Sequence, residues 1–141
     1  MKRSNIHRTL TLGLLMAVGA CSESADTASV LSSVEPVPGR LAVVVASPFD
    51  NDGAYSFEVR GDGITNIRPA VEGFELFTSP SGAAIKVAVL GAPLSGEVVT
   101  FDVPDIRDPS AYQVTLVEVA DEANDVRRDI TGHTVSVAAV R

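Results

Sequence analysis

Short runs of alternating hydrophobic and polar residues fill the chain after residue 38, and this period of two is typical of β-strands. Tyr55, Phe57 and Val59 alternate with polar residues, which predicts a strand with one buried face and one wet face. Further along, the hydrophobic parity shifts at Val117, and this shift predicts a β-bulge. The eight predicted strands are centred on residues 41–46, 55–59, 64–67, 74–77, 85–89, 99–103, 112–119 and 135–139.

Glycine and proline separate these runs and predict turns. No segment shows the period of a long amphipathic helix, and residues 121–130 fit either a helical turn or a solvated loop. Short strands with frequent turns indicate an all-β fold, a single antiparallel β-sandwich of the immunoglobulin-like or jelly-roll type over residues 39–141. The predicted turns include Asp52-Gly53, Asp62-Gly63, Ser81-Gly82 and Ser95-Gly96.

The N-terminal segment has a different character from the rest of the chain. Lys2, Arg3 and Arg8 precede an apolar stretch at residues 10–18, and two small residues follow it. This order is that of a secretory signal peptide, which we predict over residues 1–20. The apolar stretch is too short for a membrane-spanning helix, which needs about 20 apolar residues.

The only cysteine of the chain, Cys21, follows the predicted signal peptide directly. The sequence Val18-Gly19-Ala20-Cys21 resembles the lipobox of bacterial lipoproteins. That resemblance implies cleavage before Cys21, an S-linked diacylglycerol on its thiol, and a fatty acid such as palmitate on the new N-terminal amine. Several acyl chains anchor a protein to a membrane far more firmly than one chain does. The alternative is an ordinary signal peptide whose removal leaves a free thiol.

Ser22 follows the predicted lipidation site. In lipoproteins of bacteria with two membranes, aspartate at that place retains the protein in the inner membrane, so serine implies transport to the outer membrane. Residues 21–38 are small, polar and closed by Pro36 and Pro38, which predicts a flexible tether before the domain at residues 39–141. The alternative is that Val30-Leu31 adds a short strand or helix to that domain.

Two stretches of the predicted domain resemble strands of cohesin-like domains. One covers residues 53–59 with the turn at 61–63 and the segment 64–67, and the other is the glycine-led run at 96–103. The resemblance implies a jelly-roll β-sandwich of an exported bacterial protein, and it carries over no binding residues. The layout of signal, tether and small domain is similar to that of small lipoproteins of the bacterial envelope.

Charge excludes two kinds of partner. Residues 21–141 carry 18 acidic side chains against eight basic ones, which leaves a net charge of −10. Nucleic-acid binding depends on clustered positive charge that releases phosphate counterions, so we exclude nucleic acid. A basic patch on anionic lipid is excluded for the same reason. The lipid anchor is therefore the predicted contact with the membrane.

Few residues of the predicted mature chain suit catalysis or metal binding. His133 is its only histidine, and we expect it to face solvent in a turn rather than to act as the base of a Ser-His-Asp triad. Zinc, copper, haem and iron–sulfur sites lack their usual ligands, so no cofactor is expected. Asp50, Asn51 and Asp52 offer clustered oxygens for a calcium ion, and a hairpin turn is the alternative interpretation of the same residues.

The remaining charged residues predict solvated surface. Acidic residues gather at 102–108 and at 121–129, and Arg127-Arg128 in the second group is expected to pair locally. Paired carboxylates for hydrolysis depend on a spatial separation that the sequence does not give. We therefore expect a non-catalytic envelope lipoprotein that binds or supports another envelope protein. The alternative is a small carboxylate- or cation-dependent hydrolase on the same anchor.

Overall fold

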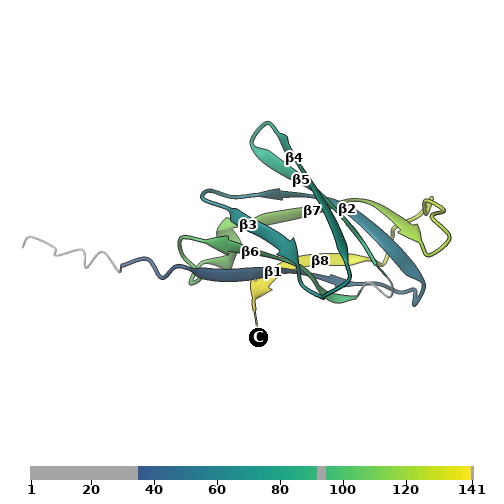
Figure 1. The fold of residues 1–141 in the computed structure, drawn as a ribbon, viewed down its shortest axis with the longest axis horizontal. Coiled ribbons are helices and arrows are strands. Elements are labelled where there is room, and N and C mark those ends of the chain that lie inside the picture. The colour runs from purple at the N-terminus through teal and green to yellow at the C-terminus, as the bar shows by residue number, and fades with distance from the viewer. Residues whose placement is uncertain (1–34, 92–94, 141) are drawn as a thin grey trace, which may run out of the picture. The chain divides into compact units, whose positions relative to one another are not determined.

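The computed structural model describes residues 35–91 and 95–140 (Figure 1). The described residues belong to one compact unit of the chain. The predicted signal peptide, the lipobox, Cys21 and the tether as far as residue 34 lie outside the described residues and stay predictions. The elements are β1 (Gly39–Ala46), β2 (Asp52–Arg60), β3 (Thr65–Pro69), β4 (Glu75–Ser81), β5 (Ala84–Leu90), β6 (Gly96–Val103), the 3₁₀ turn η1 (Pro109–Ala111), β7 (Gln113–Asp121) and β8 (Thr134–Ala139).

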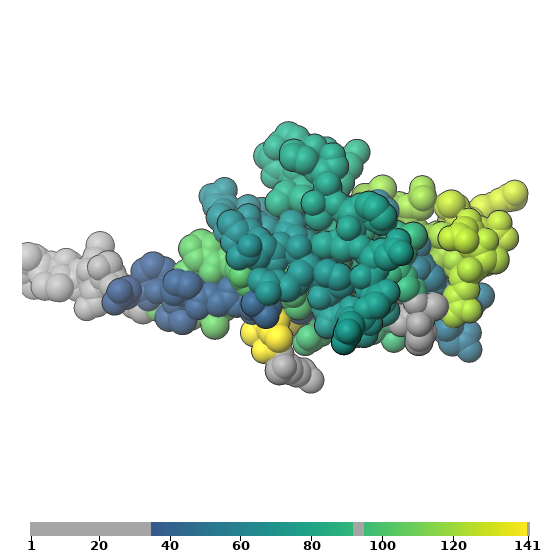
Figure 2. Space-filling view, in the orientation of Figure 1, coloured from purple at the N-terminus to yellow at the C-terminus, as the bar shows by residue number. Residues whose placement is uncertain are grey.

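Within the described ranges the strands form two four-stranded antiparallel sheets, with the orders β3-β6-β1-β8 and β4-β5-β2-β7. The pairs β1–β8, β2–β7, β3–β6 and β4–β5 are nested in the sequence, as in a long antiparallel ribbon folded back on itself. The turn between β4 and β5 projects from the sandwich in both views (Figure 1, Figure 2). This arrangement confirms the predicted all-β fold and antiparallel β-sandwich.

The hydrophobic core lies between the two sheets. Leu41 and Val43 of β1, Phe57 of β2 and Phe101 of β6 are each at most 1 % exposed and belong to one cluster. Burying each such side chain contributes about 1.5–3 kcal/mol, so this cluster is the main source of stability. Burial of every second residue from Tyr55 onward confirms the period of two that was predicted for β2.

Register shifts adjust the pairing in both sheets. The register between β2 and β7 shifts by one residue at Val117, so the bulge predicted there is confirmed. The register between β1 and β6 shifts at Val98, where the sequence predicted no bulge. This second bulge lets Val98 and Val99 both avoid solvent, with 0 % exposure each.

The structure extends one strand and corrects one predicted turn. The turn predicted at Ser81-Gly82 lies between β4 and β5, but β4 runs further than predicted, through Pro80 to Ser81, since an edge strand tolerates the missing N–H. The Asp52-Gly53 turn is wrong, because both residues open β2 and the loop before them joins strands of different sheets. Residues 122–133 contain no helical turn, so the loop is the correct alternative there.

Candidate functional site

The loops β1–β2 and β7–β8 meet on the carboxylate of Asp52, which is 1 % exposed. We call this residue and its four side-chain donors the Asp52 cluster. One carboxylate oxygen, Oδ2, accepts hydrogen bonds from Ser47 Oγ at 2.5 Å, Tyr55 Oη at 2.9 Å and His133 Nε2 at 2.8 Å. The other oxygen, Oδ1, accepts a hydrogen bond from Arg127 Nε at 2.5 Å.

Strand register places these side chains together. Ala46 and Thr134 are cross-strand partners at the end of β1 and the start of β8. Ser47 follows the first of them and His133 precedes the second, so both side chains leave the sheet at the same end. The Arg127 N–H donates to the Val119 carbonyl at 2.9 Å, which folds the β7–β8 loop back along β7.

Further contacts fix the loop that carries Arg127. The Asp121 carboxylate accepts backbone N–H groups of Ala123 at 2.9 Å and Asp125 at 3.0 Å. Arg127 Nη2 donates to Asn51 Oδ1 at 2.6 Å, and its guanidinium lies 4.2 Å from the centre of the Phe49 ring. Such cation–π contacts add to an ion pair when the cation is partly desolvated. The loop therefore closes this end of the core.

The environment shifts the pKa values of two groups in the cluster. Burial raises the pKa of Asp52, but hydrogen bonds from Ser47, His133, Arg127 and Tyr55 outweigh burial and lower it to about 2. Burial raises the pKa of the Tyr55 hydroxyl, and its hydrogen bond to the Asp52 carboxylate raises it further. Asp52 is thus ionised and Tyr55 is neutral near pH 7.

The prediction that His133 faces solvent is wrong, because its side chain is 0 % exposed. Its Nδ1 lies 3.1 Å from the Ile130 carbonyl oxygen and its Nε2 lies against Asp52, so both ring nitrogens face oxygen atoms. Ser47 and His133 bind the same carboxylate oxygen of Asp52. In a catalytic triad the histidine lies between the serine and the acid, so this arrangement is not a triad.

Arg127 also differs from the prediction of a local surface pair. Its side chain is 16 % exposed and its partner Asp52 is 75 residues away in the sequence. This pair could not be predicted from the sequence, because it forms where two loops that are far apart in the sequence meet in the fold. The only signal was a positive charge in an otherwise acidic segment.

Two of the three residues predicted for calcium, Asn51 and Asp52, have side-chain partners within the protein. Asp52 accepts four side-chain hydrogen bonds, and the Asn51 side-chain oxygen accepts one from Arg127. Asp50 is exposed and does not join them. Among residues 35–91 and 95–140, no group of three or more His, Cys, Asp or Glu side chains is placed to hold a metal ion.

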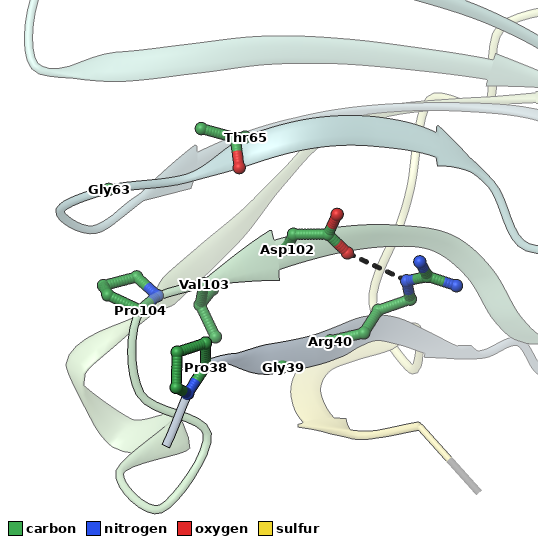
Figure 3. A pocket seen from close by; sticks show the side chains of 8 residues that line it. All are labelled: Pro38, Gly39, Arg40, Gly63, Thr65, Asp102, Val103 and Pro104. Carbon is green, nitrogen blue, oxygen red and sulfur yellow. Dashed lines mark hydrogen bonds and ion pairs between the residues drawn. The ribbon is translucent and has the colours of Figure 1, made fainter. Parts of the chain in front are cut away.

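A second polar site lies at the other end of β1. An open hollow of about 540 Å³ lies beside Asp102, and Figure 3 shows the residues that line it. Residues from the starts of β1 and β3 and from the end of β6 line it. Gly39 and Gly63 contribute no side chain to its wall. The lining residues are Pro38, Gly39, Arg40, Gly63, Thr65, Asp102, Val103 and Pro104.

Asp102 gathers donors from two neighbouring strands. Its carboxylate accepts hydrogen bonds from Arg40 Nε at 2.9 Å, Asn66 Nδ2 at 2.9 Å and Arg68 Nη2 at 3.0 Å. The hydrogen bonds from Arg40 and Asn66 hold the pKa of Asp102 below its ordinary value. The sequence grouped Asp102 with an acidic surface loop and missed these partners. The register of β1 and β3 on β6 is what brings them together.

The comparisons with known proteins return no relative. No protein-family model, no curated protein and no solved structure matches the chain. The cohesin-like resemblance therefore stays a prediction, as does the similarity to envelope lipoproteins. Within the described ranges, no helix has the length and apolar character to cross a membrane.

Proposed function

We propose that this protein is a lipid-anchored component of a bacterial envelope, whose β-sandwich binds or supports another envelope protein without catalysing a reaction. The observation that carries the anchor is Val18-Gly19-Ala20-Cys21 directly after a basic and apolar segment. Ser22 favours the outer membrane where the bacterium has two membranes. A small sandwich on a short tether would hold its loops and sheet edges close to the membrane surface.

The geometry of the Asp52 cluster supports a structural role for its residues. Catalysis by a serine or histidine needs a side chain that is free to reach a substrate and exchange a proton with it. Here the Ser47 hydroxyl donates to Asp52 and accepts the Phe49 N–H at 2.9 Å, and His133 is held by Asp52 and Ile130. Every buried side-chain nitrogen or oxygen of the described residues has a hydrogen-bond partner.

Membrane fractionation tests the anchor. The full-length chain and its Cys21→Ala variant would be expressed with a C-terminal tag and separated into membrane and soluble fractions. We expect the wild-type chain in the membrane fraction and the variant released or left uncleaved, while a Ser22→Ala variant stays anchored. A wild-type chain found in the soluble fraction would contradict the proposal.

Cross-linking in intact cells tests the binding role. We expect the anchored chain to yield a discrete cross-linked partner that the Cys21→Ala chain loses. A hydrolase would instead lose activity on Asp102→Asn or Asp52→Asn substitution while anchoring was unchanged. An anchored chain that cross-links to nothing but hydrolyses an envelope substrate would overturn the non-catalytic assignment.

A further inference from the structure

The four edge strands of the sandwich differ in how well they are protected. The sheet orders leave β3 and β8 at the edges of one sheet and β4 and β7 at the edges of the other. An edge strand presents unpaired backbone N–H and C=O groups, which invite pairing with another strand. Proteins usually block such edges with short strands, charges, prolines, bulges or covering loops.

Three of these edges carry such protection. β3 has only five residues, its register on β6 shifts between Thr65 and Arg68, and it ends at Pro69. β4 contains Pro80, which has no N–H to offer. β7 carries the bulge at Val117, and its end is covered by the bridge between Ala120 and Val126.

β8 lacks the charges, prolines and bulges that block such edges, although it has only six residues and η1 lies beside it. Its sequence, Thr-Val-Ser-Val-Ala-Ala, has no charged residue, no proline and no glycine. Its register on β1 runs without a shift from Thr134 to Ala139. Among the described residues no strand pairs with its other side. Val135 and Val137 pack against the core and still remain partly exposed, as expected for inward side chains at an open edge.

We propose that the open edge of β8 pairs with β8 of a second copy of this chain, antiparallel and about a twofold axis. Each copy then contributes the same edge to the contact, which is the commonest symmetry of protein dimers. The two four-stranded sheets that contain β8 join into one continuous sheet across the pair.

Charge favours a second copy as the occupant. The chain is strongly acidic, so two copies repel each other wherever acidic surfaces meet. Along β8 there is no charge, and self-pairing places no like charges opposite one another. A neutral strand also offers no charged group with which to select an unlike partner. Since salt screens the repulsion between the acidic bodies, the pair should strengthen as ionic strength rises.

The side-chain pattern restricts the register of the pair. A slip by one residue would turn the partner's valines to the solvent face, because side chains alternate along a strand. Two registers keep the inward residues of both copies on the same side of the joined sheet. In one, Ser136 lies opposite Ser136 of the other copy, and in the second, Val137 lies opposite Val137. In the second of these, Ser136 of one copy lies opposite Ala138 of the other.

Co-purification of differently tagged full-length copies from detergent-solubilised membranes tests the pairing. A lysine variant carries Ser136→Lys and Ala138→Lys, and a glutamate variant carries Ser136→Glu and Ala138→Glu. Like charges opposite each other should weaken lysine–lysine pairing at least about tenfold. We expect wild-type copies to co-purify, lysine copies to lose one another, and a lysine copy to recover a glutamate copy.

A matched control places the same change on a protected edge. Ser79→Lys with Ser81→Lys on β4 has the same spacing, and these copies should co-purify like the wild type. Wild-type copies that do not co-purify would overturn the proposal, whether the edge is empty or holds another protein. So would lysine copies that pair as well as wild type, or a lysine–glutamate pair that does not form. The Cys21→Ala chain, recovered with detergent from whole cells rather than from membranes, should still pair, so a failure of pairing and a failure of the anchor are distinguishable.

Discussion

Asp52 and Asp102 have similar hydrogen-bond partners, but one carboxylate is buried and the other is partly exposed to solvent. Asp52 binds Arg127 and His133 beyond the end of β1, and Asp102 binds Arg40 and Arg68 near its start. The Asp52 side chain is 1 % exposed, whereas that of Asp102 is 29 % exposed. Water solvates and screens the second site but not the first. Similar hydrogen bonds should therefore stabilise the fold by very different amounts.

The largest expected effect is that of Asp52→Ala. Removing this carboxylate leaves Arg127 Nε and His133 Nε2 without their acceptor at a buried site. Loss of one partner from a buried ion pair costs about 3–5 kcal/mol. Urea unfolding of the full-length chain should show a loss of this size in the free energy of unfolding. A loss under about 1 kcal/mol would show that Asp52 contributes no more to stability than a solvent-exposed ion pair does.

Protonation of Asp52 at low pH should have the next largest effect on stability. The pKa of Asp52 falls from 3.8 to about 2 on folding, so its contribution is fully present above pH 4 and is lost as pH falls toward 2. The shift corresponds to about 2 kcal/mol. The Asp52→Asn chain should show a shallower loss of stability over this interval, measured by urea unfolding at each pH. Identical pH profiles for the two chains would contradict the assignment.

The smallest effect is expected at Asp102. Its ion pairs are exposed to water, and such pairs contribute little to stability. Asp102→Ala should lower the urea midpoint far less than Asp52→Ala does, and molar salt should remove most of the difference from wild type. A salt-insensitive loss as large as that of Asp52→Ala would show that the two sites are not distinguished by solvent.

The two sites also show how far the sequence could predict this structure. The period of two predicted the strands and the bulge at Val117, because side-chain alternation is a local property of a strand. The partners of Asp52 and Asp102 could not be predicted. The partners of Asp102 depend on the register of β1 and β3 on β6. Arg127 and His133 reach Asp52 from a loop that lies 75 or more residues away in the sequence. Asp52 was interpreted as a turn residue because Asp-Gly favours turns, and tertiary contacts overrode that preference.

The anchor depends on the chemistry of Cys21, and intact-mass spectrometry of the chain purified from membranes tests it most directly. We predict a polypeptide that begins at Cys21, carries a diacylglycerol on its sulfur and bears a further acyl chain on its amine. A mass equal to that of the full unmodified chain, or to a chain cleaved nearby with a free thiol, would contradict the proposed function.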